Sequence, residues 1–336
     1  MHNLTCVEVC AGAGGQSLGL EHAGFHHLAA VEIDSDACRT LSLNRPGWNV
    51  IQEDLRRFSG KAYQGGVDLL AGGVPCPPFS IAGKQLGADD DRDLFPEALR
   101  LVEECRPDAV MLENVKGLSA ARFAEYRQQI LERLHALGYQ TCWRILTASD
   151  FGVPQLRPRF ILVALKPKVF EHFAWPRPAG FTPSVGKTLV RLMAAEGWPG
   201  AIAWARQADA IAPTLVGGSR KHGGPDLGPT RAREAWQRLH VDGRGVAAAP
   251  PTRDDPVDML PKLTVEMAAA IQGFPPEWKF AGSKTARYRQ VGNAFPPPVA
   301  QAVGIQLRKA IEASRSVPMG NLSRALRSWN LRQVAS

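Results

Sequence analysis

A strand, a glycine-rich turn and a helix open this chain, and this order restricts its fold more than any other stretch. The apolar run Thr5 to Val9 predicts a buried strand, and Gly12-Ala13-Gly14-Gly15 predicts a tight turn. A helix is predicted from Gln16 to Ala23, before Gly24. A second apolar run, Leu28 to Val31, ends in Glu32, about 20 residues beyond the first glycine, where nucleotide-binding α/β folds place a carboxylate on a ribose. The spacing predicts an α/β fold with an adenosine-containing cofactor; a purely structural turn is the alternative.

Further apolar runs extend the predicted sheet. Trp48 to Ile51 is followed by Asp54, which could accept a hydrogen bond from an adenine amino group or be a solvated turn residue. A fourth run leads into Cys76, and a fifth, Ala109 to Leu112, ends in Glu113. Open α/β sheets bind ligands at the carboxyl ends of their strands, so we expect Cys76 and Glu113 to share one edge.

The segment around Cys76 predicts a stiff loop. Gly72 and Gly73 end the preceding apolar run, and Pro75, Pro77 and Pro78 surround the cysteine. Prolines fix φ and remove backbone donors, so this loop holds its thiol in one direction. That geometry suits a nucleophile; the alternative is a buried cysteine that packs as a small hydrophobe.

Two later runs predict a pair of antiparallel strands. Thr141 to Leu146 and Phe160 to Leu165 are too close in sequence for a crossover helix between them. The second of these strands then begins at the edge where the others end, which brings Arg157 and Arg159 near Cys76. A surface arginine pair on a loop is the alternative.

Composition narrows the class of protein. The chain has 336 residues, of which 45% are hydrophobic and 21% charged, so it is neither disordered by composition nor membrane-spanning. No secretory signal is recognised at Met1 to Thr5, and we expect a cytoplasmic protein. The net charge of +8 favours an anionic partner. Its six cysteines show no C-x-x-C spacing, so neither a metal site nor a disulfide framework is predicted.

Beyond Lys166 the sequence becomes rich in proline and turns, which predicts a second lobe. The glycine-rich loop Gly217 to Gly224 carries Arg220, Lys221 and His222, which could meet phosphates. Regular structure returns at Leu263 to Gln272 and in a helix from Val299 to about Ala313. Beyond Glu312 the sequence has arginines and no acid, which predicts a mobile basic extension.

Taken in order, these motifs resemble those of the cytosine-5 DNA methyltransferase family, over about residues 1–165 and 260–313. The matching motifs are Cys10-Ala11-Gly12-Ala13-Gly14-Gly15, Glu32, Asp54, Pro75-Cys76, Glu113-Asn114-Val115, Gln155-x-Arg157-x-Arg159, Gln272-Gly273-Phe274-Pro275 and Gly292-Asn293.

The resemblance implies a doubly wound, mostly parallel sheet with an antiparallel last strand and a second, smaller target-recognition domain. It implies a catalytic domain at 1–175, a target-recognition domain at 176–283, a segment at 284–313 that completes the catalytic domain, and a basic tail at 314–336. The implied reaction transfers a methyl group from S-adenosylmethionine to carbon 5 of a cytosine flipped out of duplex DNA.

The resemblance also implies residue roles. Cys76 would attack carbon 6 of the cytosine, and Glu113 would hold or protonate its ring nitrogen 3. Arg159 would grip the base's carbonyl oxygen and the cysteine loop, with Arg157 supporting it. The expected cofactor residues are Cys10, Ala11, Gly12, Gly14, Gly15, Glu32, Ile33, Asp54 and Asn293.

Three positions depart from the family's usual pattern. Cys10 replaces a phenylalanine, which removes an aromatic wall of the cofactor pocket. Pro77 comes directly after the nucleophile, where glutamine is frequent, and Met267 stands where glutamate is usual. None of these three is among the residues expected to touch the base.

Three alternative functions are compatible with some or all of these motifs. A relative that methylates transfer RNA would keep the same catalytic motifs, and a catalytically silent DNA-binding relative would keep the fold. A nicotinamide-dependent dehydrogenase explains the glycine loop but not Pro75-Cys76 or Glu113-Asn114. Double-stranded DNA is the expected partner, with a cognate restriction endonuclease as a further candidate, and we expect the enzyme to act as a monomer. The DNA sequence that it recognises is not indicated.

Overall fold

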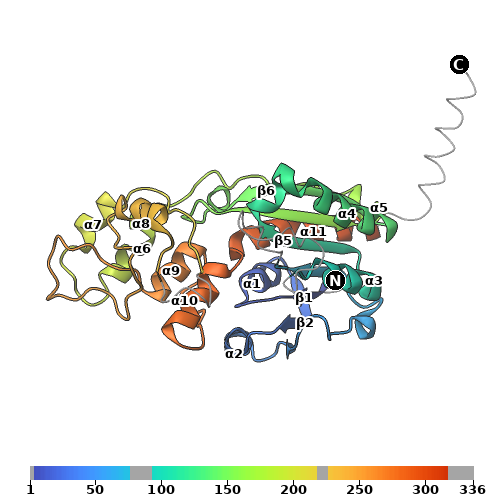
Figure 1. Cartoon of the computed structure of the whole chain (residues 1–336), viewed down its shortest axis with the longest axis horizontal. Coiled ribbons are helices and arrows are strands. Elements are labelled where there is room, and N and C mark those ends of the chain that lie inside the picture. The colour runs from blue at the N-terminus through green and yellow to red at the C-terminus, as the bar shows by residue number, and fades with distance from the viewer. Residues whose placement is uncertain (1–3, 76–92, 218–225, 317–336) are drawn as a thin grey trace, which may run out of the picture.

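The computed structural model describes residues 4–75, 93–217 and 226–316 (Figure 1). Its described residues form a seven-stranded sheet in the order β3-β2-β1-β4-β5-β7-β6. Strands β1 to β5 pair in parallel, and β7 is antiparallel to both β5 and β6, so the predicted fold class is confirmed. The strands are β1 (Leu4–Val9), β2 (Phe25–Glu32), β3 (Val50–Gln52), β4 (Leu69–Gly72), β5 (Ala109–Val115), β6 (Gln140–Thr147) and β7 (Pro158–Leu165).

The described residues also form α-helices and short 3₁₀ turns. The α-helices are α1 (Gly15–His22), α2 (Ser35–Asn44), α3 (Phe95–Cys105), α4 (Ala124–Ala136), α5 (Pro167–Phe170), α6 (Val185–Met193), α7 (Ala201–Gln207), α8 (Thr230–Gln237), α9 (Val265–Gln272), α10 (Lys284–Asn293) and α11 (Pro297–Ser316). Short 3₁₀ turns are η1 (Lys61–Tyr63), η2 (Lys116–Ser119), η3 (Ala121–Phe123) and η4 (Ala148–Phe151).

Both faces of the central strands of the sheet are buried, as the alternation along β5 illustrates. Ala109 and Met111 face the core that α1 and α11 cover, whereas Val110 and Leu112 face the core that α3 and α4 cover. Successive strand residues point to opposite faces, so a strand covered on both sides must be apolar throughout. This explains why the central strands are continuous hydrophobic runs and why the sequence revealed them.

Some element boundaries differ from those predicted. β2 begins at Phe25, three residues before the predicted Leu28, and β5 continues to Val115 instead of stopping at Leu112. Polar or exposed residues at the strand ends hid these extensions from a prediction based on apolar runs. The predicted antiparallel pairing of β6 and β7 is confirmed, with Trp143 opposite Leu162. Helix α10 was not predicted.

A second core fills the region after residue 184. Its buried residues run from Val185 to Val291, joined by Leu18 of α1. Trp204 and Trp236 are buried in it. Helices α6, α7 and α8 lie together away from the sheet, with α9 and α10 between them and the sheet (Figure 1).

Helix α1 packs closely against α11 through small residues. A Cβ atom placed on Gly15 would collide with the carbonyl oxygen of Phe295, and one on Gly19 with the carbonyl oxygen of Pro297. On α11, a Cβ on Gly304 would lie 2.7 Å from the Cβ of Ala23. The C-terminal helix therefore joins the first helix of the chain at van der Waals contact distance.

The predicted mobile extension needs correction at its start. Helix α11 continues to Ser316, and Arg315 forms ion pairs with Asp68 and with Asp108, the latter at 2.7 Å. These aspartates lie just before β4 and β5, so Arg315 ties the end of α11 to the amino edge of the sheet. Residues 317–336 lie outside the described residues.

We expect Gly19→Ala to destabilise the fold even though alanine is the better helix former, because its methyl group has no space beside Pro297. Overpacking of this kind destabilises by roughly 1–3 kcal/mol. Chemical denaturation would measure the change. Gly47→Ala is the matched control, since a Cβ there meets nothing within 4 Å. Equal stability of the Gly19→Ala and Gly47→Ala proteins would contradict the close packing of α1 on α11.

Candidate active site

The strand register determines which residues meet at the carboxyl edge of the sheet. Val9 of β1 is opposite Gly72 of β4, and Gly72 is opposite Leu112 of β5. The residues directly after Gly72 and Leu112 are Gly73 and Glu113, so they stand at one level. A Cβ on Gly73 would lie 3.3 Å from Oε2 of Glu113. Because Gly73 has no side chain, the carboxylate has room at this edge.

Glu113 forms a buried ion pair with Arg159. Nε of Arg159 lies 2.7 Å from Oε1 of Glu113, and the two side chains are 11% and 12% exposed. Burial raises the pKa of Glu113 above its ordinary value, and the charges of Arg159 and Arg157 offset part of the rise. Burial also lowers the pKa of Arg159, and the negative charge of Glu113 partly offsets this lowering. Burial therefore favours the protonated form of the Glu113 carboxyl group over its ionised form.

Arg157 joins three segments that are distant in sequence. The residue is 1% exposed, and its Nη1 donates to the carbonyl oxygen of Leu215 at 2.7 Å. Its Nη2 donates to the carbonyl oxygen of Gly292 at 2.8 Å. Burial, followed by the nearby charge of Arg159, lowers the pKa of Arg157 well below its ordinary value. Arg157 thus connects the start of β7 to the segment before Gly217 and to the end of α10.

Asn114, which follows Glu113 in the same motif, links the ends of β5 and β4. Its buried side chain donates from Nδ2 to the carbonyl oxygen of Val74 at 2.7 Å. Its Oδ1 accepts from the N–H of Val115 at 2.8 Å. Buried amides need partners, so an asparagine at the end of a buried strand was the signal for such a contact. Asn114 holds the backbone that leads to Pro75.

A cleft of about 360 Å³ opens beside the glycine loop. Gly12 has a φ of 55°, in the left-handed region that favours glycine, and its N–H donates to Oε2 of Glu32 at 2.8 Å. The N–H groups of Ile33 and Asp34 donate to Oε1 of Glu32, each at 2.8 Å. Burial raises the pKa of Glu32, and these three N–H groups oppose the rise. The loop therefore fixes the carboxylate at the cleft wall.

The far end of the cleft has an apolar and an acidic side. Ile33 is 64% exposed and lines the cleft, as does Asp54 after β3. The backbone N–H of Arg56 donates to Oδ1 of Asp54 at 3.0 Å and, as the main cause, lowers the pKa of Asp54. Asp54 is therefore ionised at neutral pH. An apolar side chain beside an ionised carboxylate suits a flat ring that carries an amino group.

All of the predicted cofactor residues except Gly14 line this cleft. The cleft-lining members of the predicted set are Cys10, Ala11, Gly12, Gly15, Glu32, Ile33, Asp54 and Asn293. Gly14 instead precedes α1 in a left-handed conformation, where a Cβ would lie 2.7 Å from the side chains of Leu41 and Trp278. Cys10 is also left-handed, with a φ of 51°, and burial raises its pKa far above the ordinary range. Its thiol is therefore protonated at neutral pH.

Two features of the cleft were not predicted from the sequence. The side chain of Gln16, 4% exposed, lines the cleft, and neither of its amide atoms has a hydrogen-bond partner among the residues that the structure describes. Arg289 of α10 pairs with Asp34 at 3.1 Å beside the same cleft. A glutamine after a glycine loop could have suggested the first, whereas no local signal joins residues so distant in sequence as Arg289 and Asp34. The buried Gln16 amide provides a donor and an acceptor for the polar end of a ligand.

A second cavity, of about 660 Å³, adjoins the first. Gly73, Pro75, Glu113 and Asn293 line both cavities. The remaining walls of the second cavity include Arg157, Arg159 and the segments 117–118, 122–123 and 214–217. The Glu113 carboxylate therefore stands where the two cavities meet.

The predicted nucleophile Cys76 lies outside the described residues, as do Arg220, Lys221 and His222. Within the described ranges, no three His, Cys, Asp or Glu side chains are grouped so that they could hold a metal ion. Over the same ranges, no helix has both the length and the apolar character needed to cross a membrane.

Two curated relatives align over most of this chain. The type II methyltransferase M.NaeI of Lentzea aerocolonigenes is 60% identical over 314 residues, which is 93% of this chain and 76% of that protein. The type II methyltransferase M.NgoMIV of Neisseria gonorrhoeae is 52% identical over 312 residues, which is 92% of this chain and 98% of the relative.

Two solved structures share the fold. A putative DNA modification methyltransferase encoded within an Escherichia coli prophage has a TM-score of 0.64 at 24% identity, covering 92% of this chain and 99% of that one. DNMT2 of Spodoptera frugiperda has a TM-score of 0.64 at 17% identity, covering 91% and 99% of the two chains. At such identities the likeness is one of fold alone.

The sequence pattern of the family described as C-5 cytosine-specific DNA methylase matches residues 4–309, and two type II methyltransferases share more than half of the aligned residues. The chain therefore belongs to this family and is a DNA (cytosine-5-)-methyltransferase.

Proposed function

We propose that this enzyme flips a cytosine out of duplex DNA, attacks it with Cys76 and methylates carbon 5. One observation carries the proposal: the buried pair of Glu113 and Arg159 stands at the junction of two cavities. A methyl donor in the smaller cavity and a base in the larger one would then meet beside a carboxyl group. Family membership implies S-adenosylmethionine as the methyl donor.

The smaller cavity has groups that fit S-adenosylmethionine. Glu32, fixed by three backbone N–H groups, would accept hydrogen bonds from the ribose hydroxyls. Ile33 would pack on the adenine ring, and the ionised Asp54 would accept from its amino group. Gln16 and Asn293 would bind the methionine end. The cofactor supplies an electrophilic methyl group when it is bound.

The larger cavity has groups that fit the base. The thiolate of Cys76 would add to carbon 6, and the charge that this addition places on the ring would be neutralised at nitrogen 3 by a proton from Glu113. Arg159 would donate to the carbonyl oxygen of the base while it keeps the Glu113 carboxyl in place. Carbon 5 would then take the methyl group, as the bond between that group and the sulfur of the donor breaks. Loss of the carbon-5 proton to a base, departure of the Cys76 sulfur and return of the nitrogen-3 proton to Glu113 would restore the aromatic ring.

Reading of the surrounding base pairs would belong to the lobe at 176–283. Extruding the base costs a few kcal/mol of stacking and pairing, which contacts on both sides of the duplex must offset. The groups at the sheet edge reach only the flipped cytosine. The net charge of +8 supports binding to a polyanion.

The type II methyltransferase relatives support a role in restriction–modification. A cognate endonuclease as a functional partner, and action of the methyltransferase as a monomer, are parts of the same proposal. Family membership and the type II relatives favour DNA over transfer RNA, the alternative substrate. Methylation assays on duplex DNA, with transfer RNA as the control polymer, would measure this preference.

We expect Cys76→Ser to abolish methyl transfer and to leave cofactor and DNA binding intact, because a hydroxyl is a much weaker nucleophile than a thiolate at neutral pH. Radiolabelled methyl incorporation would measure the loss. DNA with fluorine at carbon 5 of the target cytosine should trap a covalent adduct with the unaltered enzyme, since the final proton loss is blocked. Near-normal methylation by Cys76→Ser would remove Cys76 from the mechanism.

We expect Glu113→Gln to lower turnover by about 100- to 10,000-fold, the usual contribution of general acid–base catalysis, with cofactor affinity unchanged. Burial raises the pKa of Glu113, so its proton-donating form persists to higher pH than that of an exposed glutamate. Turnover of the unaltered enzyme should therefore fall as pH rises through that raised pKa, and the variant should lack this decline. Glu103→Gln, at a half-exposed glutamate on α3, is the control. Loss of cofactor binding with normal single-turnover chemistry would show that Glu113 serves the other cavity.

We expect exchange of the lobe at Pro176 to Gly282 with that of a relative of different specificity to transfer the recognition sequence. An active chimera that still methylates the original site would place sequence reading elsewhere. Within the lobe, Arg220→Ala should relax the preference at one base pair by about 1–3 kcal/mol if Arg220 reads a base. A phosphate contact would instead weaken binding to all sequences and reduce its salt dependence.

A further inference from the structure

The loop after β3 forms one wall of the cofactor cleft but has little support from the sheet. Residues 53–56 line the cleft, and β3 itself spans only Val50–Gln52 at the sheet's edge. Within the loop, the N–H of Arg57 donates to the carbonyl oxygen of Asp54 at 2.8 Å. Leu55 and Phe58 are buried in the core under α3. A loop of this kind needs contacts from outside the sheet to keep Asp54 in place.

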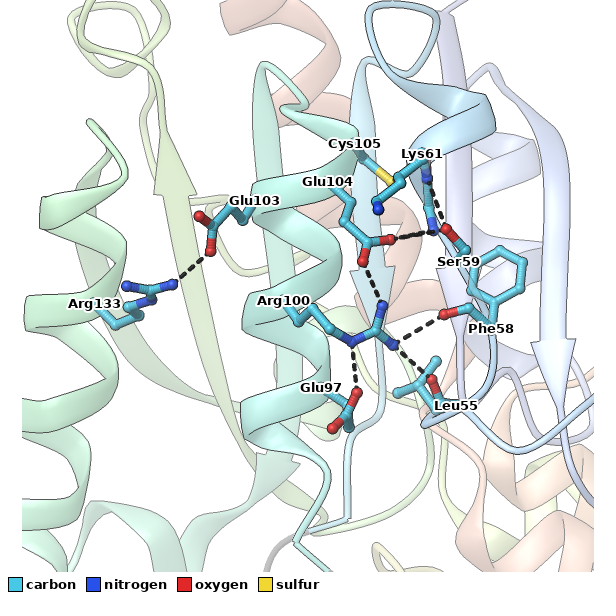
Figure 2. A network of polar contacts seen from close by, with 11 residues as sticks. Leu55, Phe58, Ser59, Lys61, Glu97, Arg100, Glu103, Glu104, Cys105 and Arg133 are labelled. Carbon is cyan, nitrogen blue, oxygen red and sulfur yellow. Dashed lines mark hydrogen bonds and ion pairs between the residues drawn. The ribbon is translucent and has the colours of Figure 1, made fainter.

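Arg100 of α3 supplies these contacts (Figure 2). Its Nη2 donates to the carbonyl oxygens of Leu55 at 3.0 Å and of Phe58 at 2.9 Å. On its other sides the guanidinium pairs with Glu97, from Nε at 2.7 Å, and with Glu104, from Nη1 at 2.7 Å. The two carboxylates fix the plane of the guanidinium, so that one nitrogen reaches both loop carbonyls.

Glu104 extends the same network to the end of the loop. One of its oxygens accepts from Arg100, and the other accepts from the N–H of Gly60 at 2.6 Å and from the hydroxyl of Ser59 at 3.3 Å. The thiol of Cys105 donates to the carbonyl oxygen of Gly60 at 3.4 Å. Helix α3 thus holds the loop at both ends, just beyond Asp54 and just before η1.

We propose that Arg100 is a positioning residue for the methyl donor: it sets the affinity for the adenosine end by fixing the loop that carries Asp54. The inference rests on the proposed binding of S-adenosylmethionine in the cleft. Arg100 acts through the backbone, because its acceptors are the carbonyls one and four residues after Asp54. The sequence alone did not indicate a role for this residue.

A neighbouring ion pair provides the comparison. Arg133 of α4 pairs with Glu103 of the same helix α3, and Figure 2 shows this pair beside the Arg100 network. Its side chains are 53% and 50% exposed, and the pair joins two helices without touching the loop. Loss of Arg133 removes an ion pair from α3 but no hydrogen bond to the Leu55 or Phe58 carbonyl, so it controls for a general effect of losing an ion pair on this helix.

The test compares Arg100→Met with Arg133→Met, using S-adenosylhomocysteine binding measured by calorimetry. We expect Arg100→Met to weaken binding about tenfold, equivalent to about 1.4 kcal/mol. The KM for S-adenosylmethionine should rise by a similar factor, with kcat and the KM for DNA nearly unchanged. Arg133→Met should match the unaltered enzyme. Equal affinity of both variants and the unaltered enzyme would overturn the positioning role, whereas no binding by the unaltered enzyme would instead overturn the proposed function.

A double-mutant cycle with Asp54→Ala tests the route of the effect. If Arg100 acts through Asp54, Arg100→Met should weaken binding less than about twofold in the Asp54→Ala background, because coupled residues are not additive. A full tenfold loss in that background would overturn the proposed route. If Arg100→Met does not fold, Arg100→Lys replaces it in both tests: lysine keeps a charge between the glutamates but cannot reproduce the guanidinium fork. Unchanged affinity in Arg100→Lys would then overturn the inference.

Discussion

The buried guanidinium of Arg157 is the contact on which the geometry of the larger cavity depends. Burying an isolated charge costs several kcal/mol, and only well-placed acceptors offset that cost. Both of its acceptors are backbone carbonyls, on Leu215 and Gly292, so neither can turn away without moving its whole segment. A Cβ on Gly292 would overlap the backbone of Gly217, which means that these two segments touch at main-chain distance. Replacement of Arg157 would leave two buried carbonyls unpaired, a larger penalty than the loss of one hydrogen bond.

This junction explains how parts from different regions of the chain can form one site. The strand register brings together only residues at the strand ends, such as Gly73 and Glu113. The walls opposite come from segments 214–217 and from α10, and the Arg157 contacts fix both relative to β7. Asn293, next to the glycine that Arg157 holds, lines both cavities. The positions of the smaller and the larger cavity are therefore coupled through one buried side chain.

The sequence predicts features that depend on local pattern and misses those that depend on distant contacts. Continuous apolar runs predicted the strands of the sheet. Glu32 and Glu113 were predicted because each stands directly at the end of such a run. Both signals are contained within a few residues. Arg157 was predicted near the site, but its acceptors lie 58 and 135 residues away, and no local pattern encodes such partners. Helix α10 was missed because its buried face is polar as well as apolar, as the buried Gln290 shows.

Arg100 and Arg157 each donate hydrogen bonds to two backbone carbonyls, but Arg100 is partly exposed and Arg157 is buried. Loops at a sheet edge have no ladder partners, so their carbonyls need donors from elsewhere, and a guanidinium fork can serve two carbonyls at once. Arg100 is about one-third exposed and lies between two carboxylates, so its charge is balanced and partly solvated. Arg157 is buried and donates both hydrogen bonds to neutral carbonyls, with Glu113 as the charge that favours its ionised form. The smaller cavity should thus tolerate change at Arg100 better than the larger cavity tolerates change at Arg157, where the guanidinium, the two carbonyls and the Glu113 carboxyl form one desolvated group.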